Sequence, residues 1–225
     1  MMALRKVQGT FWSFYAQLYD FIWDSPVTRH VSAHIAKVVG TPENVVDLVC
    51  GTGLFSRPFT RSGAHTLGVD TSSTMLHRAV RTGRISEPQK ANAAATGLPT
   101  GKYELVLCAN VLHRHPEPEA VIAETRRLVK PGGHVVWVVP SPGMTRRQVL
   151  VTDLNTGRPW ASSLTAHLAR TAVTLLAALS RVQRTSSSAV LNGLHATAAK
   201  QRLPIETAPG MSQTQSVMIS RAPDK

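Results

Sequence analysis

The chain has 225 residues, of which 43% are hydrophobic and 17% charged, and its formal net charge at pH 7 is +12. This length allows one large domain with a substantial core, and the composition is ordinary for a globular protein. No secretory signal pattern opens the sequence, and its most apolar helical stretch, residues 171–180, is shorter than a membrane span, so we expect a soluble cytoplasmic protein.

The positive charge is uneven, because residues 1–140 contribute +5 and residues 141–225 contribute +7. Such a balance suits an anionic partner, such as nucleic acid, acidic lipid or an anionic substrate. However, no run of five basic residues occurs, and no basic patch is interleaved with aromatic residues. A solvated basic surface is the simpler interpretation, and a nucleic-acid partner is not expected.

The predicted elements alternate between strands and helices after two N-terminal helices, over about residues 10–23 and 27–39. Apolar, β-branched runs predict strands, and capping residues followed by a terminal glycine or basic residues predict helices. The order is a strand over 44–50, a short helix ending at Gly63, a strand over 64–70, a helix over 71–83, a strand over 103–109, a helix over 116–130, a turn at 131–133 and a strand over 134–140. This order favours a parallel sheet with helices on both faces.

Residues 144–200 interrupt the alternation and look mainly helical, and the last residues indicate a closing pair of strands. We therefore expect a single domain over residues 1–225. Its parts are N-terminal cap helices over 1–40, a core over 41–140, a helical insertion over 141–200 and closing strands over 201–225. The two cysteines, Cys50 and Cys108, lack metal-ligand spacing and are expected to be small buried residues, so no metal site is predicted.

The stretch NVVDLVCGTGLFS, residues 44–56, predicts a strand that runs into a glycine turn and a helix. Gly51 and Gly53 permit a tight turn and close approach of the backbone to a ligand. Asp70 ends the next strand, where a carboxylate can accept hydrogen bonds from both hydroxyls of a ribose. Neither GxxxxGK[ST] nor GxGxxG is present, so the pattern indicates a ribose-binding loop without a pyrophosphate site.

Four motifs in order, VVDLVCGTG, LGVDTSSTML, LPTGKYELVLCANVLHR and LVKPGGHVVWVVP, resemble those of class I S-adenosylmethionine (SAM)-dependent methyltransferases. The resemblance covers roughly residues 40–140 and is nearest to the methyltransferase type 11-like branch that acts on small molecules. It implies a Rossmann-like α/β fold with a seven-stranded, mostly parallel sheet and a helical lid before the last strands. It also implies SAM as the cofactor.

By this resemblance, Asp47, Gly51 and Gly53 shape the pocket for the methionine part of SAM, and Asp70 and the adjoining Thr71 lie at the ribose. Met75 or Leu76 would pack on the adenine, although ordinary packing of a helix explains both residues equally well. The family often has an aspartate at the adenine amino group. Here Asn92 is the candidate, with a loop residue as the alternative.

Val49 stands where the family usually has glycine, close to the cofactor. We expect the valine to narrow the pocket and weaken binding without abolishing it, because a strand residue accepts valine without strain in φ. Tyr15 and Tyr19 resemble family tyrosines that cover the cofactor or substrate. Packing of an amphipathic helix explains them as well.

Methyl transfer from a sulfonium requires alignment of the acceptor with the methyl group, and a base only where the acceptor must lose a proton. The segment CANVLHRH follows the fourth predicted strand, so Asn110 and His113 are the catalytic candidates, with His113 as a general base. A family feature that packs or caps the next helix is the alternative for His113.

The insertion carries Trp160, Leu164, Leu168, Leu175 and Leu176, which would form an apolar wall beside the substrate, with Arg170 and Arg181 at its rim. Packing of the insertion, or a homodimer interface, would explain them too. We expect O-, N- or C-methylation of a small, largely apolar molecule, for example in secondary metabolism. The alternatives are an RNA methyltransferase and a SAM-binding protein that transfers no methyl group, either a scaffold or a cyclase.

Overall fold

The computed structural model describes residues 16, 18–142, 145–155, 159–179, 189–190, 192–193, 205–207 and 215–224. Tyr15 and Arg181 lie outside the described residues, and the side chains of Leu175 and Leu176 are not described. The described part opens on a helical segment over residues 18–23 and continues with α2 (Pro26–Val39). Ser25 caps α2 by accepting a hydrogen bond from the Thr28 amide, and Pro26 occupies the first turn.

The predicted elements of the core follow in order, with one further strand, Glu87–Lys90, that the prediction did not include. Their bounds are β1 (Asn44–Leu48), α3 (Arg57–Arg61), β2 (His65–Asp70), α4 (Ser73–Arg81), β3 (Glu87–Lys90), β4 (Tyr103–Ala109), α5 (Pro118–Leu128), β5 (Val129–Pro140), α6 (Arg146–Asn155), α7 (Trp160–Leu179), β6 (Ile205–Thr207) and β7 (Gln215–Arg221). The strands form one sheet in the order β3-β2-β1-β4-β5-β7-β6. β1 to β5 pair in parallel, whereas β7 pairs antiparallel to β5 and β6.

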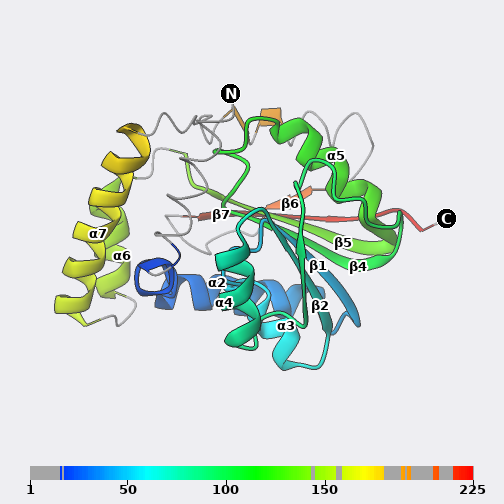
Figure 1. The fold of residues 1–225 in the computed structure, drawn as a ribbon, viewed down its shortest axis with the longest axis horizontal. Coiled ribbons are helices and arrows are strands. Elements are labelled where there is room, and N and C mark those ends of the chain that lie inside the picture. The colour runs from blue at the N-terminus through cyan, green and yellow to red at the C-terminus, as the bar shows by residue number, and fades with distance from the viewer. Residues whose placement is uncertain are drawn as a thin grey trace.

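The helices cover both faces of the sheet, with α5 on one face and α2, α3 and α4 on the other (Figure 1). Successive side chains of a strand point to opposite faces of the sheet, so each strand contributes to the core on both faces. Val46 and Leu48 of β1 belong to the cluster packed against α5, whereas Val45 packs on the face of α2. The predicted Rossmann-like, mostly parallel sheet with helices on both faces is therefore confirmed.

Residues 131–133 differ from the prediction, which placed a turn there before the strand at 134–140. These residues lie within β5, which runs from Val129 to Pro140. The pairing of β4 with β5 shifts register between Tyr103 and Leu105, whose partners are Val129 and His134. The intervening residues bulge out of the ladder, so a proline–glycine signal that predicts a turn produces a bulge instead.

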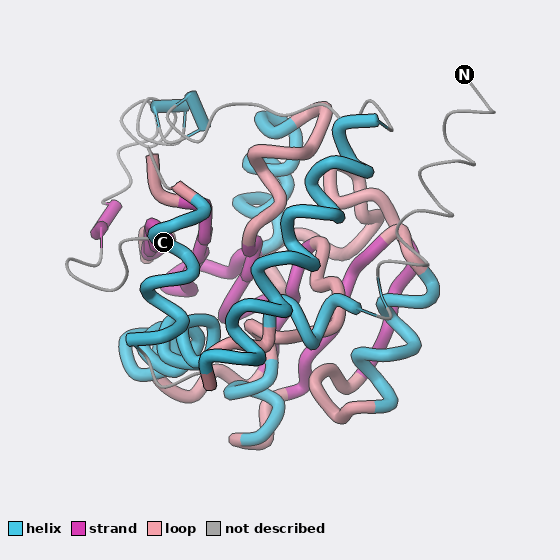
Figure 2. Tube along the Cα trace, turned by 90° about the vertical axis from the view of Figure 1, so that its left-hand side faces the viewer, coloured by secondary structure: helices cyan, strands magenta, loops and turns pink. Residues whose placement is uncertain are grey.

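α6 and α7 stand together beyond one end of the sheet, at the left of Figure 1. Viewed from that side, the helices lie in front of the strands (Figure 2). Among the described residues, none of the helices combines the length and the hydropathy that a bilayer crossing requires. Cys50 and Cys108 are both buried and free, which confirms their predicted role as small core residues.

Candidate functional site

The carboxyl ends of β1, β2 and β4 meet at one edge of the sheet, because β1 pairs in parallel with both of the others. In an open parallel sheet this edge is where ligands bind. The residues that follow the three strands therefore surround one location. They are the loop over 49–53, Thr71 and Asn110.

Two residues at this edge have strained backbones. Val49 has φ of 56° and Asn110 has φ of 57°, and within the described part of the chain no other non-glycine residue has positive φ. Asparagine tolerates this conformation, but a β-branched residue there is a true outlier, with a strain of about 1–3 kcal/mol. The expectation that Val49 belongs to a strand and carries no strain in φ is wrong, because β1 ends at Leu48 and Val49 begins the turn.

The glycine turn itself is as predicted. Gly51 has φ of 54° and Gly53 has φ of 74°, which L side chains rarely adopt. A Cβ atom at Gly53 would lie 2.8 Å from Cβ of Arg84, so only glycine fits there. At Gly51 a Cβ atom would lie 3.7 Å from the ring of Tyr19. Tyr19 therefore covers the turn from the N-terminal helical segment.

Asp70 joins the end of β2 to the glycine turn. Its Oδ2 accepts a hydrogen bond from the Gly51 amide at 3.0 Å, and its Oδ1 accepts one from the Ser72 amide at 2.8 Å. Burial raises the pKa of Asp70, and the amides of Ser72, Gly51 and Thr71 oppose the shift. Because a carboxylate offers about four acceptor positions, these amide contacts leave capacity for ribose hydroxyls.

Asp47 is the second buried carboxylate at this edge, with an exposed fraction of 2%. The Ser56 hydroxyl donates to its Oδ2, whereas its Oδ1 has no hydrogen-bond partner among the described residues. Burial raises the pKa of Asp47 to about 7, the Ser56 hydrogen bond opposes the shift, and the charge of Asp70 adds to it. A cationic group bound nearby would relieve this desolvation.

The site therefore fits SAM on its own geometry. It offers a glycine cradle that side chains would fill, a carboxylate with unused acceptor positions and a buried carboxylate oxygen that lacks a donor. SAM carries a sulfonium and an ammonium group as well as ribose hydroxyls. Opposite charge and free acceptors are what those groups require.

The remaining cofactor candidates are Thr71 for the ribose and Met75 and Asn92 for the adenine. Thr71 is exposed and follows Asp70. Met75 is 3% exposed and clusters with Ala16 and Ile22 beneath the N-terminal helical segment. Asn92 is exposed, and its Oδ1 accepts a hydrogen bond from the Ala94 amide, which forms a local turn. Met75 and Asn92 thus have structural contacts of their own.

The catalytic candidates lie just after β4. The Asn110 amide donates to the carbonyl of Val138 at 2.7 Å, which fixes Asn110 beside the end of β5. His113 is partly buried, and its Nε2 accepts a hydrogen bond from Nε of Arg114 at 3.2 Å. Nε2 of His113 is therefore an acceptor, as a general base requires, and in this structure Arg114 occupies it.

Sequence reasoning missed four polar residues around the loop. They are Ser56, which bonds Asp47, and Thr52, Asp20 and Arg84, which bond one another. One signal was available, because Asp20 and Asp24 stand four residues apart in an otherwise apolar helical stretch and so share one helix face. Their arginine partners come from distant parts of the sequence and carry no such signal.

The predicted apolar wall is largely on the surface. Trp160, Leu164 and Leu168 have exposed fractions of 74%, 44% and 59%, at a spacing that puts them on one side of α7. Arg170 lies inward, since its Nη2 donates to the carbonyl of Ile22 at 2.8 Å and its guanidinium lies over the Trp23 ring. α7 is thus attached to the helical segment that covers the glycine turn.

Comparison with known proteins matches residues 46–137 to a family described as a methyltransferase domain. A curated relative, the ubiquinone biosynthesis O-methyltransferase of Acinetobacter baylyi, is 30% identical over 115 residues, which are 48% of this chain and 47% of that protein. The chain therefore matches about half the length of the curated relatives, such as this one and its counterpart from Paraburkholderia xenovorans.

Solved structures share the fold across more of the chain. A Burkholderia thailandensis 1,6-didemethyltoxoflavin-N1-methyltransferase, with its substrate and S-adenosylhomocysteine (SAH) bound, matches with a TM-score of 0.61 and 16% identity, covering 98% of this chain and 90% of the other. The [4+2]-cyclase SpnF matches with a TM-score of 0.53 and 15% identity, covering 87% and 80%. One fold thus serves a methyl transfer and a cyclisation, so the fold does not decide the reaction.

Proposed function

We propose that this chain, whose residues 46–137 match a family described as a methyltransferase domain, transfers a methyl group from SAM to a small, largely apolar molecule in the cytoplasm. One observation carries the proposal. Asp70 at the end of β2 binds the Gly51 amide of the glycine turn, and buried Asp47 stands beside both. The arrangement provides ribose acceptors and negative charge at the ligand edge of the sheet.

In this proposal Asp70, with Thr71 beside it, holds the ribose hydroxyls, and Gly51, Gly53 and Asp47 hold the methionine part. When bound, SAM supplies a methyl group on a positively charged sulfur. Asp47 favours that positive charge, since its Oδ1 has no donor among the described residues. Met75 and Asn92 would border the adenine, and Val49 would border the methionine part.

The protein's main contribution is alignment and exclusion of water. The ring of Tyr19 lies against Gly51 and so covers the glycine turn. Arg170 holds α7 onto the same helical segment through Ile22 and Trp23. α6 and α7 would then act as the lid on the acceptor side, with Leu164 and Leu168 offering apolar surface to the substrate.

Where the acceptor is a hydroxyl or an amine that must lose a proton, His113 would take it at Nε2, and Asn110 would orient the acceptor. The names of the relatives favour oxygen or nitrogen over carbon, because one is an O-methyltransferase and another an N-methyltransferase. An apolar ring that bears a hydroxyl or an amine is the acceptor class that we would screen first.

The test begins with calorimetric titration of the purified protein with SAM and, separately, with SAH. We expect micromolar binding of both, followed by methyl transfer to an acceptor, detected as the mass of one added methyl group. Failure of correctly folded protein to bind either ligand would overturn the proposal.

A second candidate function is binding of SAM without methyl transfer. Strained Val49 supports it, because the valine occupies the position where the cofactor needs room. The shared fold of a cyclase is consistent with it. SAM binding together with a product that has gained no methyl mass would favour this candidate.

A further inference from the structure

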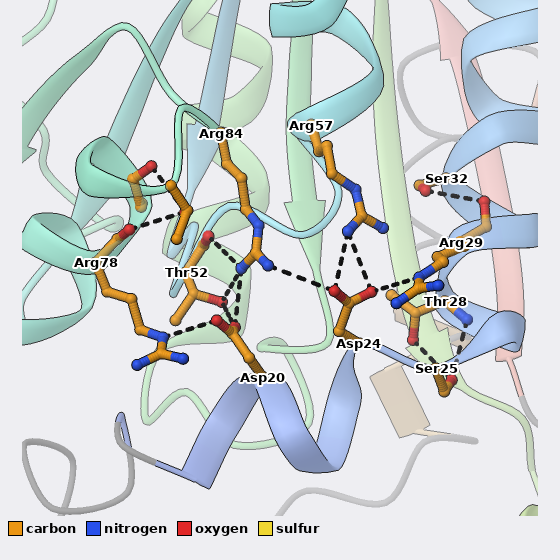
Figure 3. A network of polar contacts seen from close by, with 12 residues as sticks. Asp20, Asp24, Ser25, Thr28, Arg29, Ser32, Thr52, Arg57, Arg78 and Arg84 are labelled. Atoms are coloured by element: carbon orange, nitrogen blue, oxygen red, sulfur yellow. Dashed lines mark hydrogen bonds and ion pairs between the residues drawn. The ribbon is translucent and has the colours of Figure 1, made fainter. Parts of the chain in front are cut away.

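Two carboxylates, Asp20 in the N-terminal helical segment and Asp24 directly after it, hold four arginines from separate parts of the chain (Figure 3). Asp20 pairs with Arg78 of α4 at 2.7 Å and with Arg84 at 2.9 Å. Asp24 pairs with Arg29 of α2, Arg57 of α3 and Arg84, at 2.8, 3.0 and 3.4 Å. Except for the pair with Arg29, whose side chain is 59% exposed, these pairs are largely shielded from water, since the side chains of Arg84, Asp20 and Asp24 are only 10%, 13% and 15% exposed. They are therefore screened less than surface pairs.

Asp20 makes one contact that Asp24 does not. Its Oδ1 accepts a hydrogen bond at 2.6 Å from the hydroxyl of Thr52, the residue between Gly51 and Gly53. Arg84 completes a triangle, because its Nη1 donates to Asp20 and also to the carbonyl and hydroxyl of Thr52, at 3.3 and 3.4 Å. Thr52 is fully buried. The centre of the glycine turn is thus held by a carboxylate and a guanidinium.

Packing brings the same residues against the two glycines. Cβ of Arg84 lies so near Gly53 that no side chain fits there. Tyr19, the neighbour of Asp20, covers Gly51 with its ring. The turn is therefore held between the N-terminal helical segment and Arg84. Its backbone has few intrinsic restraints, because glycines have more conformational freedom than other residues.

Burial alone would raise the pKa of Asp20, but hydrogen bonds from Thr52 and Arg78 and the charge of Arg84 outweigh it and hold the pKa below its usual value. Asp20 is therefore ionised at neutral pH. An ionised carboxylate accepts stronger hydrogen bonds than a neutral group does, by roughly twofold.

We infer that Asp20 is a positioning residue for the cofactor, acting through Thr52 and Arg84 to fix the glycine turn in the shape that receives the ligand. Asp24 has a different role, because its two closer partners, Arg29 and Arg57, join the helical segment to α2 and α3. Its third partner, Arg84, meets Asp24 only at 3.4 Å and through Nη2, whereas Nη1 is the nitrogen that bonds Thr52. The role of Asp20 toward the cofactor rests on the proposed function, whereas its role in fixing the turn rests on the contacts alone.

Hydrogen exchange on the ligand-free protein tests the turn directly, with Asp20→Asn and Asp24→Asn as a matched pair. In Asp20→Asn we expect exchange of the backbone amides of residues 50–56 to rise about tenfold, since a charge-assisted hydrogen bond is lost. In Asp24→Asn we expect these amides to keep their wild-type rates, while residues 18–23 and α2 exchange faster. Equal acceleration of the turn in both variants would overturn the inference and leave Asp20 as a general anchor.

Because Asp20→Asn leaves Arg78 and Arg84 with a weaker partner, Thr52 supplies a milder pair of variants. Thr52→Val removes only the hydroxyl, and Thr52→Ser restores it. We expect SAH affinity to fall about tenfold in Thr52→Val and to return in Thr52→Ser, with the fold intact in both. Unchanged exchange and affinity in Thr52→Val would count against the inference. If the wild-type protein binds no SAH, the proposed function fails, and the exchange rates still decide whether Asp20 positions the turn.

Discussion

The glycine turn is fixed by buried polar contacts, whereas α7 presents exposed apolar side chains. Residues 50–56 are all buried, and directional contacts from Asp70, Asp20 and Arg84 fix the turn. On α7, Trp160 and Leu168 are mostly exposed. Directional contacts demand particular residues at particular positions, whereas apolar surface accepts many substitutions. The cofactor can therefore be inferred from motifs, but the acceptor cannot.

The glycine turn also carries two unfavourable terms. Val49 is strained, and buried Asp47 has a pKa of about 7. Backbone strain and buried carboxyl groups with shifted pKa values persist only where surrounding contacts hold them in place. They are concentrated at functional sites. Around the turn, the contacts that Asp20 and Arg84 make with Thr52 and with each other supply part of that restraint.

The largest effect is expected from Asp70→Ala, which removes the acceptor of both the turn amide and the proposed ribose hydroxyls. We expect affinity for SAM and SAH to fall by more than about 100-fold, since two or more hydrogen bonds to a charged group are lost. Calorimetry measures the affinity, and circular dichroism checks the fold. Unchanged affinity in folded protein would remove Asp70 from the site.

On the acceptor side, His113→Gln tests the proposed base. We expect kcat to fall about 100-fold at neutral pH with little change in SAH affinity, as for loss of a general base. The acidic limb of the pH–rate profile should vanish in the variant. A profile that keeps its shape would mean that His113 only packs beside α5 or that the acceptor needs no base.

Asp47→Asn should stabilise the ligand-free protein in a pH-dependent way. The folded pKa of about 7 lies above the usual 3.8, so the wild-type carboxyl loses its contribution as pH rises from about 4 through 7. We expect the variant to be about 2 kcal/mol more stable at pH 8 and to show no gain below pH 4. Urea unfolding measures it, with exposed Asp224→Asn as the control. A gain that does not vary with pH would contradict the assignment.

Val49→Gly should relieve the strain in the turn and widen the pocket. We expect SAH to bind about tenfold more tightly, whereas stability changes by less than about 1 kcal/mol, because strain relief and added chain entropy oppose each other. Val49→Ala separates the two causes, since it removes the branched carbons but keeps a Cβ atom at positive φ. Tighter SAH binding in both variants would indicate that the branched valine side chain crowds the pocket. Tighter binding in Val49→Gly alone would indicate that backbone strain is the cause. Weaker binding in Val49→Gly would contradict both.

The smallest effect is expected from Leu168→Ser on α7. If its side chain contacts the acceptor, KM for the acceptor should rise about fivefold, since part of one apolar contact is lost, and SAH affinity should stay constant. Val80→Ser on α4 is the control, because Val80 is also an exposed apolar residue on a helix. A change in sedimentation in place of a change in KM would identify the side of α7 as a dimer interface.

Much of the core could be predicted because its signals are local. Apolar runs gave β1, β2 and β4 to within two residues, and capping patterns gave α4 and α5. β3 was not predicted, because its four residues, EPQK, lie at the sheet edge and are mostly exposed. No buried face therefore produces an apolar alternation in the sequence.

The sequence by itself determined most of the order of the core elements, the glycine turn and the place of Asp70 at the end of β2, because each depends on residues within one motif. Only the tertiary structure decided that Val49 is strained, that Oδ1 of Asp47 has no donor among the described residues and that Asp20 reaches Thr52 and Arg84. These features depend on burial and on contacts between residues up to 64 positions apart. Hydrogen bonds and desolvation arise where side chains meet in space, and spacing along the chain does not record such meetings.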